Sequence, residues 1–364
     1  MPKGLYIHVP FCNGKCPYCD FYSVSPTDSL LERYTEKICS VLKEKNHLTF
    51  DTVYFGGGTP SLLMPERIGR ILNDINIKSG AEITVECNPS DTGSESGRFD
   101  FEKLAECGVN RISLGLQSGN DRERQFLGRR AGAKDAERAV RRAQSAGITN
   151  ISLDLMLGIS SQTMQSLEES FDLCVSLGAK HVSAYMLKIE PDTPYHNIRG
   201  KLSLPDEDEV CDLYLRCCEL AEKHSMYQYE ISNFAYKGYE SRHNLKYWHC
   251  EEYLGIGPAA HSFINGKRFY YERSLDGFLG GASPVADGEG GDFEEYAMLA
   301  LRLSEGLSLS KTNERFGFPV PDSIIKKAQA LEKQGLVQIN KDSISLTRNG
   351  FLLSNAVISR LLLE

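Results

Sequence analysis

The chain has 364 residues, of which 41% are hydrophobic and 25% are charged, and its formal net charge is -8. This composition excludes a disordered chain and leaves room for one large barrel with a smaller domain, or for two or three ordinary domains. The acidic balance also argues against a general nucleic-acid binder, because such proteins need a basic surface to displace counterions from phosphate.

The sequence contains 11 cysteines, an odd and scattered set that does not suit a secreted disulfide framework. The first residues, "MPKGLYIHVPF", contain no apolar core of a signal peptide, and no run of about 18 apolar residues follows. We therefore expect a cytoplasmic protein without a transmembrane helix. In a reducing compartment, clustered cysteines indicate a metal site.

The first half of the chain alternates short β-branched runs with segments of helical period. Strands are expected over 5–9, 52–55, 82–87, 111–116, 151–156 and 181–187. Helices are expected over 29–45, 65–78, 100–107, 134–146 and 163–177. This alternation predicts βα units and a parallel sheet. The periodicity leaves open whether the sheet is doubly wound or an incomplete barrel.

Polar residues fall late in these strands or directly after them. Three cysteines follow the first strand and "GGGTP" follows the second, while Glu86, Gln117 and Asp154 stand at or near the ends of the next three. Each residue alone could be a capped loop or a satisfied polar core group. Together they favour a site at the carboxyl edge of the sheet, where parallel α/β folds carry their active sites.

The second half is more mixed. An amphipathic helix with an acidic start is expected over 206–224, and a turn-rich boundary over 280–292. Two helical segments, the hairpin pattern "LVQINKDSISLT" and a closing helix then predict a winged-helix-like module. From residue 292 onward there are nine Lys or Arg and nine Asp or Glu, so this module lacks the basic surface that DNA binding requires.

The cysteine loop "CNGKCPYC" places Cys12, Cys16 and Cys19 at the spacing C-x3-C-x2-C. Thiolates suit zinc and iron–sulfur clusters, but a structural zinc site would show a second ligand pair at regular spacing. Three thiolates can instead bind three irons of a [4Fe–4S] cluster and leave the fourth iron open to a small molecule. The glycine run is not a Walker loop, because no Gly-Lys-Ser/Thr follows it.

The loop resembles the motif of the radical S-adenosylmethionine (SAM) superfamily, in which the methionine part of SAM binds the fourth iron. The segments "LYIHVPFC", "GGGTPSLL", "VECNP", "GVNRISLGLQS", "DLMLG" and "ISNFA…SRHNLKYW…YLGIGPAAHS" resemble the coproporphyrinogen dehydrogenase-like branch, and most closely the HemW-type haem chaperones. This resemblance implies a partial (β/α)6 barrel over 1–200, a mixed extension over 201–282 with an HNxxYW motif, and a winged-helix-like domain over 283–364.

The resemblance also implies the residues of the site. The cluster ligands would be Cys12, Cys16 and Cys19. The residues contacting SAM would be Tyr6, Tyr18, Gly57, Gly58, Thr59, Glu86, Gln117, Arg129 and Asp154. Opposite charges such as those of Glu86 and Arg129 would suit the zwitterionic methionine group.

Position 21 separates two activities within this branch. True coproporphyrinogen III dehydrogenases extend the motif to C-x3-C-x2-C-x-C, whereas this chain has Phe21. That difference favours a haem chaperone that delivers haem to acceptor haemoproteins. The alternatives are oxidation of coproporphyrinogen III to protoporphyrinogen IX, and a non-catalytic binding protein that retains the barrel. Whether the chain is an enzyme stays open.

The haem-trafficking motif "HNLKYW" makes His243 the candidate haem ligand, with His249 and His261 as weaker candidates. The branch implies a flavodoxin- or ferredoxin-type electron donor, while a homodimer and a peripheral membrane contact stay open.

The chain departs from the family pattern at three places. It has "GISSQT" over 158–163 where relatives often have "GLPGQT", Gly119 where Phe is usual, and Ala131 where His is frequent. These departures put the details of cofactor contact in doubt. The eight cysteines outside the loop are expected to be small buried residues.

Overall fold

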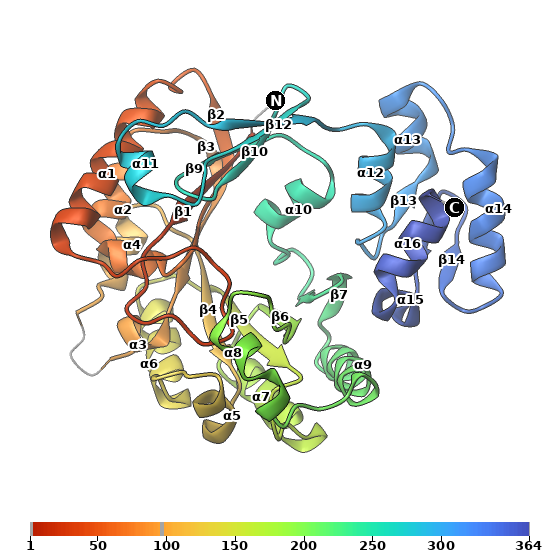
Figure 1. The fold of residues 1–364 in the computed structure, drawn as a ribbon, viewed down its shortest axis with the longest axis horizontal. Helices are drawn as coiled ribbons and strands as arrows, with labels where there is room; N and C mark the ends of the chain where they lie inside the picture. Colours follow the sequence, from red (N-terminus) through yellow and green to blue (C-terminus); the bar gives the residue numbers. More distant parts are fainter. Residues whose placement is uncertain (1–2, 95–97, 364) are drawn as a thin grey trace.

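A computed structural model describes residues 3–94 and 98–363. Six parallel strands lie side by side in the order of the sequence (Figure 1). They are β1 (Lys3–Val9), β2 (Thr49–Gly57), β3 (Asn76–Cys87), β4 (Arg111–Gln117), β5 (Asn150–Leu157) and β6 (His181–Met186). A doubly wound sheet would reverse its strand order at a switch point. The unbroken order therefore confirms the partial barrel.

Further strands extend both edges of the barrel into a 12-stranded sheet. Next to β1 lies the parallel β9 (Tyr253–Ile256), followed by the antiparallel β10 (His261–Ile264), β11 (Lys267–Tyr270) and β12 (Val285–Glu289). Next to β6 lie β8 (Asn233–Ala235) and β7 (Tyr227–Glu230). We expected a turn-rich boundary over 280–292. This prediction is wrong for Val285–Glu289, which forms β12 at the edge of the main sheet.

The helices expected in the first half are all present. They are α1 (Asp28–Lys43), α2 (Met64–Asn73), α4 (Phe101–Glu106), α6 (Ala133–Ser145) and α7 (Met164–Ser176), and the acidic helix of the second half is α9 (Glu207–Lys223). The expected end of α2 at residue 78 is wrong, because β3 already begins at Asn76. The shorter helices are α3 (Pro89–Thr92), α5 (Asp121–Phe126), α8 (Pro194–Asn197), α10 (Arg242–Trp248) and α11 (Leu275–Leu279), with 3₁₀ turns η1 (Pro60–Leu63) and η2 (Arg199–Lys201).

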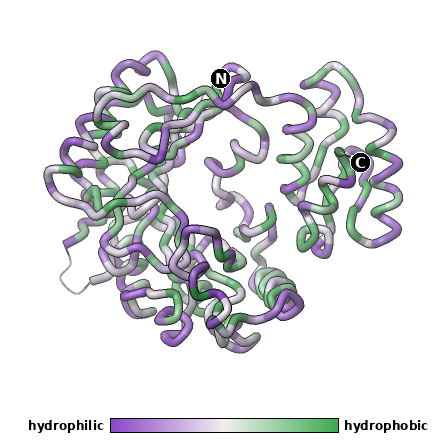
Figure 2. The backbone as a smooth tube through the Cα atoms, viewed as in Figure 1, coloured by the Kyte–Doolittle hydropathy of each residue, from purple (hydrophilic) through white to green (hydrophobic). Residues whose placement is uncertain are grey.

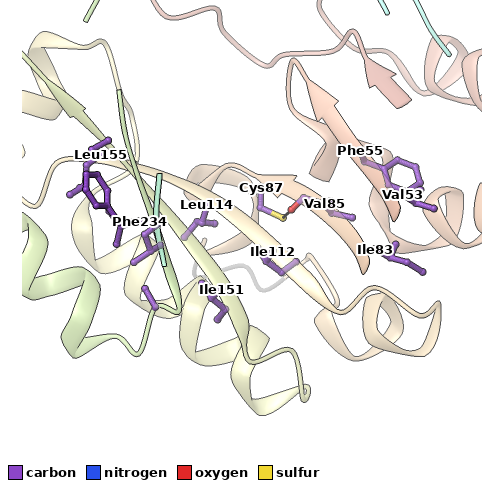
Figure 3. Close-up of a cluster of buried hydrophobic side chains, with 14 of the residues drawn as sticks. Val53, Phe55, Ile83, Val85, Cys87, Ile112, Leu114, Ile151, Leu155 and Phe234 are labelled. Atoms are coloured by element: carbon purple, nitrogen blue, oxygen red, sulfur yellow. Dashed lines mark hydrogen bonds between the residues drawn. The ribbon is translucent and has the colours of Figure 1, made fainter. Parts of the chain in front are cut away.

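Along most of their length, the barrel strands alternate between an apolar and a polar face. Ile112 and Leu114 of β4 pack with residues of the neighbouring strands against the helices, as Figure 3 shows. Arg111, Ser113, Gly115 and Gln117 of the same strand line a cavity on the other face. The interior of this barrel is therefore polar, unlike the packed branched side chains that fill a complete (β/α)8 barrel.

The C-terminal part forms a separate module beside the barrel (Figure 1). Its elements are α12 (Phe293–Ala300), β13 (Leu307–Ser308), α13 (Leu309–Phe316), α14 (Asp322–Glu332), β14 (Val337–Ile339), β15 (Ser343–Leu346), α15 (Arg348–Leu352) and α16 (Ser354–Leu362). Five helices with a three-stranded sheet agree with the winged-helix-like arrangement expected here. We expected a single closing helix at the end of the chain. This prediction is wrong, because Leu353 separates two helices, α15 and α16.

Along the tube of Figure 2, hydrophobic and hydrophilic residues alternate in the barrel and in the C-terminal module alike. Within 3–94 and 98–363, no helix combines the length and the apolar character needed to cross a membrane. Six of the eight remaining cysteines are buried, as expected, whereas Cys107 and Cys211 are only half-buried.

The turn between β5 and α7 contains a strained residue. Ser161 has a φ of 63°, in the left-handed region that L-residues with a Cβ disfavour by roughly 1–2 kcal/mol. Glycine would carry no such cost at this position. The turn is still held in place, because Gln162 Oε1 accepts hydrogen bonds from Gly158 N at 2.8 Å and Ile159 N at 3.3 Å.

We therefore predict that Ser161→Gly raises the free energy of unfolding by about 1 kcal/mol, measured by urea denaturation. Ser160→Gly is the matched control, because Ser160 lies in the same turn without a positive φ. An equal gain from both substitutions would show that the left-handed backbone is not the cause.

Candidate functional site

The site is a cavity of about 460 Å³ at the carboxyl ends of the barrel strands, a volume typical of small-molecule sites. Of the residues predicted to bind the cluster or SAM, every one except Tyr6 lines it: Cys12, Cys16, Tyr18, Cys19, Gly57, Gly58, Thr59, Glu86, Gln117, Arg129 and Asp154. Tyr6 lies behind the wall, with its hydroxyl 3.1 Å from Nδ1 of His8.

The cysteine loop connects β1 to α1 and is closed at its base by backbone pairing. Cys12 N donates to Val24 O at 3.0 Å, and Val24 N donates to Pro10 O at 2.8 Å. Between these bonds, Phe11 is fully buried, with its ring 5.4 Å from that of Tyr34. The three thiols are thus carried on a loop whose ends are fixed to the core.

The thiols themselves are half-buried at the mouth of the cavity. Burial raises the pKa of Cys19 above its ordinary value. Among the described residues, no three Cys, His, Asp or Glu side chains converge on one metal ion. Convergence is not needed for a cubane, because each thiolate binds a different iron of the cluster.

The loop is also tied to the segments that follow β3, β4 and β6. Arg130 donates to the carbonyl oxygen of Asn13, whose side chain donates to Asp91 at 3.2 Å. Tyr195 N donates to the carbonyl oxygen of Pro17 at 3.0 Å. The arginine loop that carries Arg129 and the cysteine loop are therefore positioned together.

The glycine run after β2 is needed for close backbone packing. Gly57 has a φ of +109°, and a Cβ there would lie 2.7 Å from the ring of His8. A Cβ on Gly58 would lie 2.5 Å from the carbonyl oxygen of Phe11. Gly58 N donates to Val9 O at 2.9 Å. A side chain at Gly58 would therefore push the cysteine loop away from β2, and one at Gly57 would displace the ring of His8.

Glu86 lies on the polar face of β3 and accepts two hydrogen bonds, from Tyr54 Oη at 2.8 Å and from Gly57 N at 3.2 Å. Burial raises the pKa of its carboxyl to about 7, and the bonds from Tyr54 and Gly57 oppose that rise. A cation placed in the cavity would stabilise the ionised form of Glu86 relative to its protonated form.

Arg129 reaches the cavity from the loop after α5, and its Nε is buried without a hydrogen-bond partner among the described residues. A Cβ on Gly115 would lie 3.0 Å from its guanidinium and 2.9 Å from the amide of Gln117, so this glycine makes room for both. Gln117 itself has a φ of 68°. Arg129 forms no salt bridge with Glu86 in this structure, so the two opposite charges stand apart around the cavity.

Asp154 completes the wall from β5. Its carboxylate accepts a hydrogen bond from Ser113 Oγ at 3.2 Å and another from Ser183. Burial raises the pKa of Asp154, and these hydrogen bonds work against the rise.

The sequence reasoning missed the inner part of the cavity, which is lined by Tyr54, Arg111, Ser113, His181, Ser183, Tyr185 and Asn244. All but Asn244 occupy alternate positions of the barrel strands. The signal that could have identified them is this period of two, since a fully buried parallel strand would be apolar on both faces.

The candidate haem ligand His243 is fully buried on α10 and does not line the cavity. Its Nδ1 lies 2.8 Å from Thr52 Oγ1 and its Nε2 lies 2.7 Å from Tyr247 Oη. Burial lowers its pKa to about 3. Both ring nitrogens are therefore engaged in this conformation.

The two weaker histidine candidates lie outside the cavity as well. His249 Nε2 is 2.9 Å from Glu305 Oε1, and His261 is exposed on β10. The departures from the family pattern at Gly119, Ala131, Ser160 and Ser161 do not line the cavity either.

Comparisons with known proteins agree with this geometry. The model of the radical SAM superfamily matches residues 6–174, and that of the HemN C-terminal domain matches 292–353. The solved structure of coproporphyrinogen III oxidase (HemN) from Escherichia coli superposes with a TM-score of 0.82 at 19% identity, covering 100% of this chain and 90% of that one. This likeness shows the shared fold. Fold, cysteine loop and family model together define a radical SAM protein.

Curated relatives narrow the assignment. The protein named heme chaperone HemW of Bacillus subtilis is 34% identical, with 100% of both chains covered. That of Escherichia coli is 32% identical, covering 100% of this chain and 99% of the relative. The chain belongs to the HemW family of radical SAM proteins. Membership implies a [4Fe–4S] cluster and SAM, and the cavity fits both, because it gathers three thiols with the unpartnered Nε of Arg129.

The raised pKa of Glu86 predicts a pH dependence of the cofactor-free protein. The folded state holds a proton on Glu86 up to about pH 7, whereas an unfolded glutamate loses it near the ordinary value of 4.5. The stability that this proton provides is complete below about pH 4.5 and is lost as the pH rises towards 7. Glu86→Gln should remove this decline, which amounts to about 3 kcal/mol between the two values. Urea unfolding at several pH values measures it.

Glu36→Gln is the matched control, since Glu36 is exposed on α1. Identical pH profiles for wild type and Glu86→Gln would contradict the raised pKa.

Proposed function

We propose that this radical SAM protein binds haem at the mouth of the cavity and delivers it to acceptor haemoproteins. The observation that carries the proposal is Phe21. It stands where coproporphyrinogen III dehydrogenases have an additional cysteine, and it is 63% exposed while lining the mouth. An exposed aromatic beside a cavity suits ligand binding better than an aromatic needed for the core.

The chemistry of the mouth suits a porphyrin, which is a flat apolar ring with two carboxylates. Phe21, Met186 and Leu187 supply apolar surface, and Met186 is 39% exposed. Lys15 and Lys188 line the same mouth and can face propionates, although Lys188 also pairs with Glu190. An apolar lip with cations at its margin matches both parts of such a ligand.

We further propose which residues of the site hold the cluster and which contact SAM. Cys12, Cys16 and Cys19 hold the cluster, and the methionine part of SAM lies between Glu86 and Arg129. Gln117 and Asp154 then face the rest of the cofactor. When bound, the cluster and SAM supply one-electron chemistry. The residues of the chain bind and orient these groups and keep water from them, with Glu86 able to release a proton as the cationic cofactor enters.

His243 is proposed to take part in haem binding. For its imidazole to reach an iron, the ring has to leave Thr52 and Tyr247. Because α10 is only seven residues long and follows the β7–β8 hairpin, a shift of this helix would release the ring. Haem loading would then be coupled to the position of α10.

Oxidation of coproporphyrinogen III stays the second candidate. The observation in its favour is that nearly the whole predicted set of cluster and SAM residues lines one cavity. A chaperone that only carries haem would have less need of that arrangement. The oxidation requires an electron donor that reduces the cluster, and we propose a flavodoxin- or ferredoxin-type protein.

A haem titration of cluster-reconstituted protein under anaerobic conditions tests the function. We expect wild type to bind haem stoichiometrically. Phe21→Ser should weaken binding by roughly tenfold or more, because it removes the exposed aromatic surface proposed to pack on the porphyrin. His243→Ala should weaken binding and alter the haem absorbance.

The matched control is Phe318→Ser, since Phe318 is 43% exposed on the C-terminal module. Unchanged haem affinity in Phe21→Ser would contradict the proposed mouth. Unchanged affinity in His243→Ala would remove that histidine from the site.

A further inference from the structure

A second, smaller pocket lies where the barrel meets the C-terminal module. Its volume is about 350 Å³, and its walls come from the β7–β8 hairpin, from α10 and from the turn after α12 (Figure 1). The two parts are joined directly beside it, because Glu230 pairs with Leu303 in a β-bridge and Ser304 N donates to Tyr229 O at 3.0 Å. Junctions of this kind are frequent places for small-molecule sites.

The hairpin side of the pocket presents two buried acceptors. Glu230 is 2% exposed and Asn233 is 4% exposed, and both line the pocket. Asn233 Nδ2 donates to the carboxyl of Glu230, which also accepts from Ser232 N at 3.1 Å. This bond fixes the orientation of the amide, and it leaves Asn233 Oδ1 buried without a hydrogen-bond partner among the described residues. A ligand that supplies N–H donors would satisfy this oxygen.

The C-terminal module contributes a positive charge to the same pocket. The guanidinium of Arg302 donates to Asn355 Oδ1 at 3.0 Å and lies 5.9 Å from the centre of the Trp248 ring. Within the described parts of the chain it forms no ion pair with Glu230 or any other carboxylate. Arg302 and Glu230 therefore line one pocket as opposite charges that do not meet.

The pKa values of both residues reflect this missing partner. Burial raises the pKa of Glu230 to about 7, and Arg302 opposes that rise. Burial also lowers the pKa of Arg302, and Glu230 opposes that change. Each charge is thus felt by the other, but it is compensated only in part, which is costly for buried groups.

A zwitterion would compensate both charges at once. An ammonium group has three donors, enough for the carboxylate of Glu230 and the free oxygen of Asn233. A carboxylate matches the fork of the Arg302 guanidinium. An α-amino acid carries both groups on one carbon and can bridge two charges that stand too far apart for a direct ion pair. A ligand with only one charge would leave Glu230 or Arg302 uncompensated.

The remaining walls of the pocket are aromatic. Tyr185, Tyr247 and Trp248 line it, and Tyr185 is 42% exposed. These rings offer apolar surface to the side chain of an amino acid.

From this geometry we propose that the pocket binds a free α-amino acid with an apolar side chain. Glu230 and Asn233 hold its ammonium group, and Arg302 holds its carboxylate. Because Tyr185 and Asn244 line both this pocket and the cavity with the cysteine loop, the amino acid would lie next to that cavity. The proposal does not depend on haem carriage.

The alternative role for Glu230 and Arg302 is structural, as charges that help to hold the C-terminal module on the barrel. The two roles differ in one measurable respect. A structural pair has no preference among ligands, whereas an amino-acid site discriminates against molecules that lack either charge.

The experiment titrates the full-length, cluster-reconstituted protein with three probes under anaerobic conditions. The probes are L-phenylalanine, its methyl ester, which lacks the carboxylate, and N-acetyl-L-phenylalanine, which lacks the ammonium group. Trp248 reports binding by its fluorescence, because it lines the pocket and is the only tryptophan of the chain. Wild type should bind L-phenylalanine roughly tenfold or more tightly than either derivative.

Two substitutions assign the charges. Arg302→Gln should lower the affinity for L-phenylalanine to about that for the methyl ester, and should change the affinity for the ester by no more than about twofold. Glu230→Gln should do the same with respect to the N-acetyl derivative. Arg302→Lys should keep a weaker preference over the ester, because it retains the charge but not the fork.

Arg315→Gln is the matched control. The guanidinium of Arg315 donates to the carbonyl oxygens of His249 and Cys250 at 3.1 and 2.9 Å, so it also joins the C-terminal module to the segment after α10. Arg315 does not line the pocket. Its substitution should leave the preference for L-phenylalanine unchanged.

Three results would overturn the proposal. They are the absence of a Trp248 response to L-phenylalanine, equal affinities of wild type for the three probes, and a loss in Arg315→Gln as large as that in Arg302→Gln. The comparison of probes on wild type needs no variant, so it decides the matter even if Arg302→Gln and Glu230→Gln do not fold.

Discussion

The structure depends on the alternation of two faces along the barrel strands. One face has to be apolar, because helices pack on it and supply the core. The other face is polar along most of each strand, so the interior cannot close into a dry core. Polar groups taken from water are costly unless they are hydrogen-bonded. The interior meets this demand with paired groups, such as Asp154 with Ser113, and His181 with Ser152 at 2.7 Å.

Two of the exceptions to this pairing lie in the cavity. The buried Nε atoms of Arg111 and Arg129 lack partners among the described residues, and both arginines line the cavity. His243 shows the opposite pattern, since Thr52 and Tyr247 engage both of its nitrogens. By this criterion the arginines are prepared to receive a ligand, whereas the histidine has to be released before it can bind one.

Backbone contacts explain why the cysteine loop and the glycine run occur together. Gly58 lies so close to Phe11 that no side chain fits between them. The glycines therefore hold the cysteine loop at the carboxyl edge of β2, beside Glu86. The resemblance alone suggested contact with the cofactor, and the geometry adds a packing reason within the chain.

The parts of the fold that the sequence predicted are those with long and regular patterns. The six barrel strands and their helices have β-branched or amphipathic periods that local propensity supports. The strands β7 to β11 were not predicted, because they are three to four residues long and rich in aromatic residues. The site residues at strand ends could be inferred from their shared edge and from the family motifs. Arg111 could not, because it stands at the start of its strand, and the burial of His243 depends on contacts with distant segments.

Haem carriage, with Phe21 in place of a fourth cysteine, is the central claim for this chain. The most direct measurement incubates the cluster-reconstituted protein with SAM and a reductant under anaerobic conditions, once with haem and an apo-haemoprotein and once with coproporphyrinogen III. The account predicts that haem passes to the apo-haemoprotein and that coproporphyrinogen III is recovered unchanged. Formation of protoporphyrinogen IX without haem binding would contradict it.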